Sequence, residues 1–179
     1  MRIISGLYKG RKILPPKNLP VRPTTDFARE GLFNHLNNHL YFDEISVLDL
    51  CAGTGCVSYE FASRGVKNIT AVDAEKSCVQ FIRKTAQSLD LPIDVYTSDL
   101  LHFLSKTQQQ WDVIFADPPF QIGGDVHTKT ATLVFEKGLL KEDGWLVIEH
   151  GKQTQLQHLP HFAYHKTYGN VVFSFFKKE

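Results

Sequence analysis

A proline-rich turn carries the residue types best suited to chemistry in this chain. Asp117, Pro118, Pro119 and Phe120 follow the strand-like run at 111–116. Two successive prolines continue neither a helix nor a central strand, so the chain must turn at this point. The turn offers a carboxylate, the Pro118 carbonyl and an aromatic ring, which together suit a planar base with an exocyclic amine. The alternative is an ordinary loop with a phenylalanine on the surface.

A glycine turn follows an earlier apolar run. The segment "VLDLCAGTG" places Gly53 and Gly55 shortly after Asp49. Glycines let the backbone turn sharply and approach a ligand closely. The segment lacks the G-x-G-x-x-G pattern of dinucleotide-binding folds, because Cys51 takes the place of the first glycine and the third is missing. The alternative is a turn that merely links a strand to a helix.

Two further aspartates come at the ends of strand-like runs. Asp73 ends the run "NITAVD", and Asp99 ends the run "PIDVYTSD". A carboxylate at the first position can accept hydrogen bonds from two ribose hydroxyls, and one at the second can accept from an adenine amino group. The alternatives are an acid that favours a helix start at Asp73, with Glu75 following, and a helix N-cap at Asp99.

These side chains act together only if a sheet brings their strand ends to one edge. Apolar runs alternate with helical periodicities, which predicts a mainly parallel sheet with helices on both faces. Ligands bind at the carboxyl ends of the strands in such sheets. Strands are predicted at 45–51, 68–74, 92–99, 111–119 and 144–150, and helices within 22–40 and 52–65 and at 75–89, 99–107 and 131–140. The tail at 162–178 predicts two antiparallel strands, because the turn at Gly169 and Asn170 is too tight for a helical crossover.

Composition and length are typical of one globular domain. The chain has 179 residues, of which 42% are hydrophobic and 22% charged. No run approaches the ~20 apolar residues of a membrane span, and the N-terminus lacks the apolar core of a signal peptide. The three cysteines, Cys51, Cys56 and Cys78, are odd in number and lack metal-ligand spacing. They predict a reducing, cytoplasmic location.

The charge is unevenly distributed although the net charge is only +1. Residues 1–30 hold seven Lys and Arg side chains against Asp26 and Glu30, whereas the rest of the chain is mildly acidic. Glycines and prolines punctuate residues 1–22, which predicts short strands and turns there. A basic arm on an acidic body favours a segment that faces a polyanion. The alternative is a solvated N-terminal extension.

The motifs resemble those of a known enzyme class. In this order and spacing, "VLDLCAGTG", "AVDAE", "TSDLLHFL" and "FADPPF" resemble motifs I to IV of the S-adenosylmethionine-dependent amino-methyltransferases. "RIISGLYKGRKI", "VRPTTDFAREGLFNHL" and "SRG" are similar to segments of the RsmD family, the bacterial small-subunit (16S) ribosomal RNA guanine-N2 methyltransferases. The resemblance runs from Arg2 to the "YGNVVFSFF" hairpin, and only residues 121–130 carry no recognisable motif.

This resemblance implies a fold and a domain division. The fold is a Rossmann-like class I methyltransferase fold of the α/β class. It has a seven-stranded, mostly parallel sheet, an antiparallel closing hairpin and a small N-terminal extension. We expect residues 25–179 to form the S-adenosylmethionine-dependent methyltransferase domain and residues 1–24 to form a basic, RNA-facing extension.

The resemblance also implies roles for individual residues. Those at the target amine and base are Asp117, Pro118, Pro119 and Phe120. Those that bind S-adenosylmethionine are Thr24, Asp49, Cys51, Ala52, Gly53, Gly55, Asp73 and Asp99. Those that contact the substrate RNA are Arg2, Lys9, Arg11, Lys12, Arg22 and Phe120. No metal is expected, because the sulfonium carries its own positive charge.

The implied reaction is methyl transfer to the N2 amine of a guanine in 16S ribosomal RNA. Asp117 and the Pro118 carbonyl would stabilise the positive charge that develops on the nitrogen. We expect a cytoplasmic monomer, and the small arm favours an assembling ribosomal particle as substrate. Two alternatives stay open. One is an amino-methyltransferase acting on DNA adenine, DNA cytosine or a protein glutamine, and the other is a non-catalytic RNA-binding assembly module.

Overall fold

Helices and strands alternate along most of the chain. The computed structural model describes residues 1–21, 24–119 and 125–178. The helices are α1 (Asp26–Asn37), α2 (Cys56–Ser63), α3 (Lys76–Ser88), α4 (Leu100–Lys106) and α5 (Val126–Glu136), with a short 3-10 helix η1 (Phe42–Glu44). The strands are β1 (Ser46–Leu50), β2 (Asn68–Asp73), β3 (Ile93–Thr97), β4 (Trp111–Ala116), β5 (Leu140–Gly151), β6 (Phe162–Tyr168) and β7 (Val171–Lys177).

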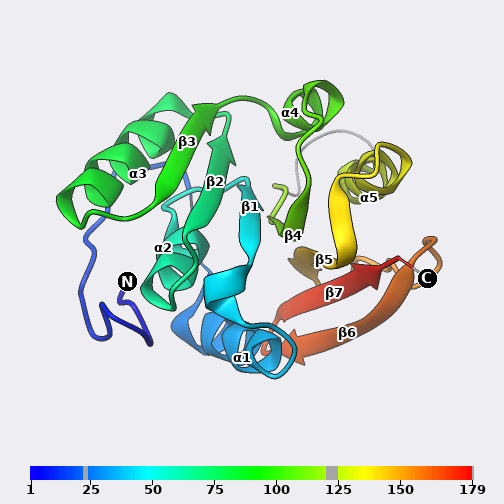
Figure 1. Cartoon of the computed structure of the whole chain (residues 1–179), viewed down its shortest axis with the longest axis horizontal. Helices are drawn as coiled ribbons and strands as arrows, with labels where there is room; N and C mark the ends of the chain where they lie inside the picture. Colours follow the sequence, from blue (N-terminus) through cyan, green and yellow to red (C-terminus); the bar gives the residue numbers. More distant parts are fainter. Residues whose placement is uncertain (22–23, 120–124, 179) are drawn as a thin grey trace.

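The strands of the described residues form a seven-stranded sheet in the order β3-β2-β1-β4-β5-β7-β6 (Figure 1). β7 pairs antiparallel with β5 and β6, and every other pair is parallel. This confirms the predicted mostly parallel sheet with an antiparallel closing hairpin. The strand order reverses at β1, which lies between β2 and β4. In open α/β sheets, such a switch point is where ligands bind.

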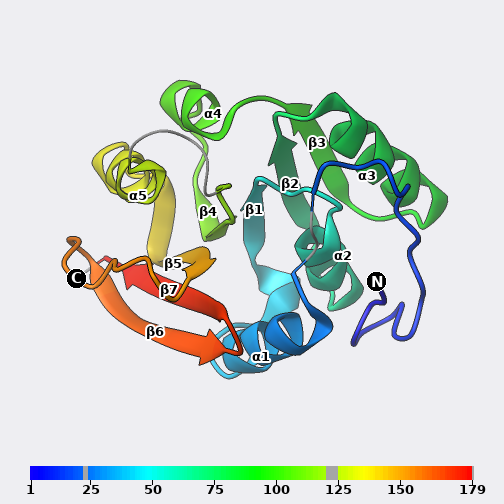
Figure 2. The same ribbon diagram turned by 180° about the vertical axis from the view of Figure 1, so that it is seen from behind.

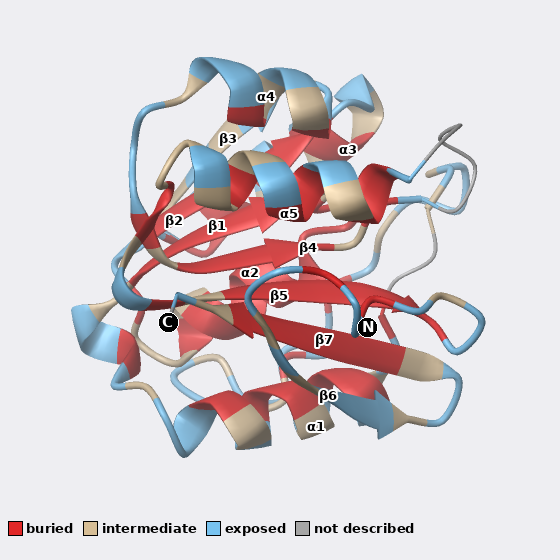
Figure 3. Cartoon of the chain, turned by 90° about the vertical axis from the view of Figure 1, so that its right-hand side faces the viewer, coloured by how far each residue is buried: buried red, intermediate tan, exposed pale blue. Residues whose placement is uncertain are grey.

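Helices cover both faces of the sheet (Figures 2 and 3). α4 and α5 pack with even-numbered strand residues such as Leu48 and Ile114. α1 and α2 pack with odd-numbered ones such as Val47 and Phe115. This division follows from the two-residue repeat of a strand, which sends neighbouring side chains to opposite faces. Within the described ranges, no helix combines the length and the apolar character that a membrane crossing requires.

The N-terminal arm (residues 1–21) is packed onto the domain. Ile3 and Ile13 are buried in an apolar cluster with residues of α2 and α3. Two backbone amides of the arm donate to the carboxylate of the buried Glu60 on α2. The predicted short strands are reduced to a single bridge between Arg2 and Lys12. The arm is therefore an ordered part of the surface in its described residues.

The predicted helix over 131–140 is wrong at both ends. α5 begins earlier because Asp125 caps it, with a carboxylate oxygen that accepts a hydrogen bond from the backbone N–H of Thr128 at 3.0 Å. It ends before Gly138, whose φ of 62° interrupts the helix. The last predicted helical residue instead begins β5, which is longer than the predicted strand at 144–150.

Candidate active site

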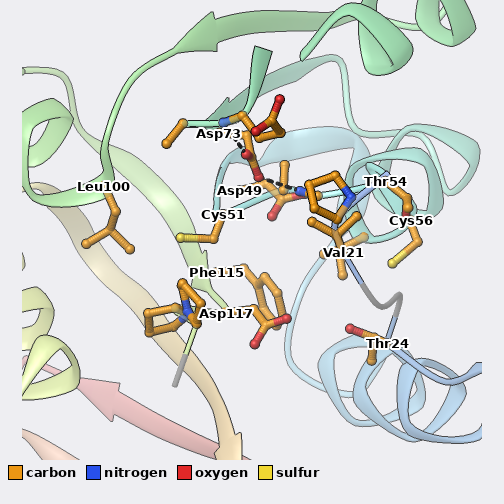
Figure 4. A pocket seen from close by; sticks show the side chains of 18 of the residues that line it. Val21, Thr24, Asp49, Cys51, Thr54, Cys56, Asp73, Leu100, Phe115 and Asp117 are labelled. Carbon is orange, nitrogen blue, oxygen red and sulfur yellow. Dashed lines mark hydrogen bonds between the residues drawn. The ribbon is translucent and has the colours of Figure 1, made fainter. Parts of the chain in front are cut away.

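A cavity of about 790 Å³ lies at the carboxyl ends of β1, β2 and β4. Figure 4 shows Asp49 and Asp73 on one side of it and Thr24 and Asp117 on the other. It is lined by Pro20, Val21, Thr24, Asp49, Cys51, Ala52, Gly53, Thr54, Cys56, Val57, Asp73, Ala74, Glu75, Asp99, Leu100, Phe115, Asp117, Pro118 and Pro119. The cavity therefore occupies the switch point of the sheet.

The structure brings most of the predicted site residues together. The predicted cofactor residues that line the cavity are Thr24, Asp49, Cys51, Ala52, Gly53, Asp73 and Asp99. Gly55 is not among the lining residues and is the N-cap of α2. Three of the four residues predicted at the target amine, Asp117, Pro118 and Pro119, also line the cavity. Phe120 lies outside the described residues.

The charged side chains of the described cavity lining are all acidic. It contains five carboxylates and, among the described residues, no Lys, Arg or His side chain. Such a wall attracts a cationic ligand with hydrogen-bond donors and disfavours phosphate groups, because like charges repel at short range. The cavity therefore does not suit a dinucleotide, in agreement with the incomplete glycine pattern.

The turn between β1 and α2 adopts an unusual backbone conformation. Cys51, Gly53 and Gly55 have φ values of 60°, 55° and 80°, all in the left-handed region. At Gly55 a side chain is also excluded by space, since a Cβ there would lie 2.7 Å from Cζ of the buried Tyr59. Glycine is thus required at Gly55 for two independent reasons, and Cys51 carries backbone strain that glycine would avoid.

Asp73 is held by the backbone of two neighbouring segments. Its Oδ2 accepts from the N–H of Gly53 at 2.8 Å, and its Oδ1 accepts from the N–H of Glu75 at 2.8 Å (Figure 4). Each carboxylate oxygen can accept a second hydrogen bond. The carboxylate is therefore fixed in place and keeps acceptor capacity for a ligand with paired hydroxyls.

Asp99 serves as the N-cap of α4. Its Oδ1 accepts from the backbone N–H of His102 at 3.0 Å, which confirms the capping alternative. The residue also lines the cavity. Its Oδ2 accepts no hydrogen bond from a described residue. Capping therefore leaves one oxygen available for a ligand.

Asp49 is the most enclosed of the cavity aspartates, with 1% of its surface exposed. Its Oδ2 accepts from the backbone N–H of Ser58 at 3.1 Å and also from the Ser58 hydroxyl. Burial raises the pKa of this carboxyl to about 7, although the Ser58 hydrogen bonds oppose the shift. Asp49 thus joins the first strand to the start of α2 from within the cavity wall.

Asp117 is positioned by the end of the β1–β4 ladder. Its backbone N–H donates to the carbonyl of Leu50 at 3.2 Å, and two prolines follow at once. The carboxylate accepts no hydrogen bond from a described residue. Figure 4 shows the Asp117 and Thr24 oxygens turned toward each other. Burial, followed by the nearby carboxyl of Glu149, raises the pKa of Asp117 well above its usual range.

Glu149 was not predicted as a site residue. It lies near the carboxyl end of β5 and is 8% exposed, and its Oε2 accepts from the hydroxyl of Thr24 at 2.9 Å. Burial raises its pKa to about 7. A signal was present in the sequence, because Glu149 is an acid at a strand end, as Asp73 and Asp117 are. None of the four motifs contains Glu149, so the resemblance assigns it no role.

The basic residues predicted to contact RNA lie outside the cavity. Arg2, Lys9, Arg11 and Lys12 are exposed on the N-terminal arm. The arm meets the C-terminal end of α2, where the N–H of Leu7 donates to the carbonyl of Ser63 at 2.7 Å. The cavity is at the other end of this helix, about 12 Å away at 1.5 Å per residue. Arg22 and its neighbour Pro23 lie outside the described residues.

The chain matches one protein family along nearly its whole length. The family model described as "Conserved hypothetical protein 95" matches residues 1–177. The chain is 29% identical over 183 residues to "Ribosomal RNA small subunit methyltransferase D" of Escherichia coli K12, covering 100% of this chain and 90% of the relative. The protein of the same name from Haemophilus influenzae is 32% identical over 161 residues, which are 87% of this chain and 81% of the relative.

Solved structures show the same fold. The Escherichia coli protein yhhF superimposes with a TM-score of 0.87 at 29% identity, covering 100% of this chain and 98% of that one. The 16S rRNA N2 methyltransferase RsmC of T. thermophilus, solved with AdoMet and guanosine, gives a TM-score of 0.70 at 22% identity. It covers 87% of this chain and 44% of RsmC. These likenesses confirm the predicted Rossmann-like class I methyltransferase fold.

Proposed function

The chain belongs to the family described as "Conserved hypothetical protein 95", which is the RsmD family. We therefore propose that it methylates the exocyclic N2 amine of a guanine in small-subunit (16S) ribosomal RNA. One observation carries this proposal most directly. The turn of Asp117, Pro118 and Pro119 presents a carboxylate that accepts no hydrogen bond from the described residues to an acid-lined cavity at the switch point of the sheet. The position suits a base that enters with its amine first.

S-adenosylmethionine is the cofactor, and the described residues fit it. The molecule carries a sulfonium, an ammonium group, two ribose hydroxyls and an adenine amine, all of which favour acceptors over cations. Asp73 is placed to accept from the ribose hydroxyls, and Asp99 has a free oxygen for the adenine amine. Thr24 and the turn around Gly53 line the part of the cavity left for the methionine moiety. When bound, the cofactor supplies an electrophilic methyl group on positively charged sulfur.

Asp117 and the Pro118 carbonyl act on the amine of the target base. That amine is a poor nucleophile, because its lone pair is delocalised into the ring. Two fixed acceptors draw its N–H bonds out of the ring plane and favour a more tetrahedral nitrogen. They also stabilise the positive charge that develops on nitrogen as the new bond forms. Holding the amine about 3–3.5 Å from the methyl carbon supplies much of the remaining acceleration.

The proposed substrate explains why the basic side chains of the arm lie away from the cavity. A guanine within a paired region must leave its stack to enter the cavity, at a cost of a few kcal/mol. Phosphate contacts from the exposed Arg2, Lys9, Arg11 and Lys12 would offset this cost. Residues 1–24 then form the RNA-facing extension and residues 25–179 the methyltransferase domain of a cytoplasmic monomer. An assembling ribosomal particle would present RNA to both parts.

The proposal is tested by a methyl-transfer assay. The protein is incubated with radiolabelled S-adenosylmethionine and one of three acceptors: naked 16S RNA, small subunits lacking the modification, or plasmid DNA. We expect label on a guanine of the RNA or the subunits. Label confined to DNA or to a protein would contradict the proposed substrate, and label nowhere would contradict the proposed activity.

The role of Asp117 is tested by Asp117→Ala in the same assay. We expect methyl transfer to fall at least a hundredfold, because the main acceptor for the amine is removed. Calorimetry should show that S-adenosylmethionine still binds, since the variant keeps the ribose and adenine acceptors. Asp94→Ala on β3 removes an exposed acid away from the cavity and serves as the matched control. Retained turnover in Asp117→Ala would remove Asp117 from the mechanism.

A further inference from the structure

Glu149 lies beside Asp117 at adjoining strand ends. β4 and β5 are parallel neighbours paired at Ala116 and Ile148, so the next residues, Asp117 and Glu149, are adjacent across the ladder. Neighbouring strands are about 4.8 Å apart. Both side chains extend to the face covered by α1 and α2, because they share the alternation that places Phe115 there. Two carboxyl groups thus lie next to each other where β4 and β5 end, and the carboxyl of Asp117 lines the cavity.

The segment before α1 fixes the orientation of Glu149. The Thr24 hydroxyl donates to Glu149 Oε2 at 2.9 Å in a buried hydrogen bond. Glu149 Oε1 accepts no hydrogen bond from a described residue. Thr24 lines the cavity while Glu149 is not among its lining residues. Glu149 therefore does not face the cavity directly, and it acts on the cavity through the neighbouring Asp117.

One buried cation, Arg29 of α1, lies beside the Cys56 thiol on this face, but its guanidinium forms its ion pairs with Asp26 and Glu60. β1 contributes the Asp49 carboxyl, α2 contributes the Cys56 thiol, and β7 pairs Phe173 with Glu149. In the part of the chain that the structure describes, neither Asp117 nor Glu149 forms an ion pair. Two buried carboxylates that lack an ion-pair partner repel each other, and the repulsion is relieved when one proton binds to the pair.

We propose that Glu149 is a positioning residue whose charge makes Asp117 the acceptor of the proton that the methylated amine releases; this inference rests on the proposed function. As the amine lone pair forms the C–N bond, the C–S bond breaks and its electron pair stays on sulfur. Asp117 then takes the N–H proton on a carboxylate oxygen. Asp117 and Glu149 then carry one negative charge together instead of two. The cavity loses the positive charge of the sulfonium in the same reaction, so its net charge is unchanged. Asp117 returns the proton to water after the base leaves.

The raised pKa values of both carboxyls agree with this arrangement. Burial and the neighbouring Glu149 raise the pKa of Asp117, and burial raises that of Glu149 to about 7. An acid with a raised pKa stays protonated to higher pH, so methyl transfer should increase as the pH rises through the range in which the pair ionises. Neutralising Glu149 should lower the pKa of Asp117 and move this range to lower pH.

The first experiment needs no substrate. In ligand-free protein labelled with 13C at carboxyl carbons, the Asp117 signal is assigned by its loss in Asp117→Asn and followed as a function of pH. Glu149→Gln keeps the size of the side chain and an oxygen that can accept from Thr24. We expect it to shift the Asp117 titration down by about one pH unit or more. Glu142→Gln, an exposed acid of the same strand, should leave it unchanged.

The second experiment measures the pH dependence of methyl transfer. Glu149→Gln should lower the maximal rate about tenfold and shift the acidic limb to lower pH, because Asp117 becomes a weaker base. Glu149→Asp keeps the charge and should keep the limb near its original position. A purely structural role would lower the rate equally at every pH.

The two experiments separate the inference from the proposed function. An unmoved Asp117 titration in folded Glu149→Gln would overturn the role of Glu149, whether or not the protein methylates RNA. A shifted titration in a protein that transfers no methyl to RNA would support the Glu149–Asp117 coupling and contradict the proposed substrate. If Glu149→Gln does not fold, the titration of Asp117 is followed in Glu149→Asp instead. This variant keeps the negative charge, so the pKa of Asp117 should stay raised, and a pKa in the usual range would contradict the inference.

Discussion

Four aspartates line the cavity, and they differ in how many hydrogen bonds their carboxylates already accept. Asp49 accepts two from Ser58, and Asp73 accepts two from backbone amides. Asp99 accepts one as a helix cap, whereas Asp117 accepts none from a described residue. Acceptors that are already engaged are held in a fixed orientation before a ligand arrives. The unengaged Asp117 suits the group that must respond to changing charge during a reaction.

At the residue scale, the preorganised Asp73 leads to a prediction about affinity. Asp73→Asn keeps the size of the side chain but turns an NH₂ group toward Gly53 N–H or Glu75 N–H. We expect the dissociation constant for S-adenosylmethionine to rise about 10- to 100-fold, because hydrogen bonds to a charged group contribute about 1.5–3 kcal/mol. Calorimetric titration measures it. Asp94→Asn on the exposed face of β3 controls for the change in net charge, and equal affinity of the two variants would contradict the role of Asp73.

Most cavity residues could be predicted from the sequence, since an acid at a strand end is recognisable without coordinates. The same rule covers Glu149, although it lies outside the four motifs that resemble known ones. Two further features depend on tertiary structure. The hydrogen bond between Thr24 and Glu149 joins residues that are far apart in the chain. The absence of Lys, Arg and His from the described cavity lining emerges only when the strand ends meet.

At the element scale, the turn from β1 into α2 leads to a prediction about stability. Gly55→Ala forces a left-handed backbone on alanine and places Cβ 2.7 Å from the buried Tyr59 ring. We expect the free energy of unfolding to fall by about 2–4 kcal/mol, from backbone strain plus overpacking. Urea unfolding measures the change.

The chain offers a matched control for this substitution. Gly10 has a nearly equal φ of 79°, but no atom lies within 4 Å of the position a Cβ would take. Gly10→Ala should therefore cost only the backbone strain, about 1–2 kcal/mol. The difference between the two variants isolates the contact with Tyr59. Equal losses would show that Tyr59 can move aside.

The sequence predicts element boundaries well where apolar residues repeat regularly. The prediction is wrong where polar residues are part of the buried face. The tail hairpin matched its predicted range, because apolar residues and the Gly169 turn mark both strands. α5 was misplaced because its buried face includes His127 and Thr130, which hide the helical repeat. Its true signals were local: Asp125 as a cap and Gly138 as a terminator.

At the scale of the whole molecule, the N-terminal arm presents its charges from an ordered position. Ile3 and Ile13 are 2% and 6% exposed and hold the arm against α2 and α3, while the basic side chains between and beside them face outward. The sequence indicated the charge but not this anchorage. A preordered basic surface loses less conformational entropy on binding than a free tail would.

The arm therefore leads to a prediction about RNA binding. Arg11→Ala combined with Lys12→Ala removes two exposed charges and leaves the buried isoleucines in place. We expect weaker binding to 16S RNA and a slope of log affinity against log salt that is shallower by about 1.5, since each lost phosphate contact removes about 0.7–0.9. Fluorescence anisotropy at several salt concentrations measures this. Lys67→Ala with Lys106→Ala removes two exposed charges near the amino ends of β2 and β4 and should leave the slope unchanged. If both double variants keep the original slope, the arm does not contact phosphates and is a solvated extension.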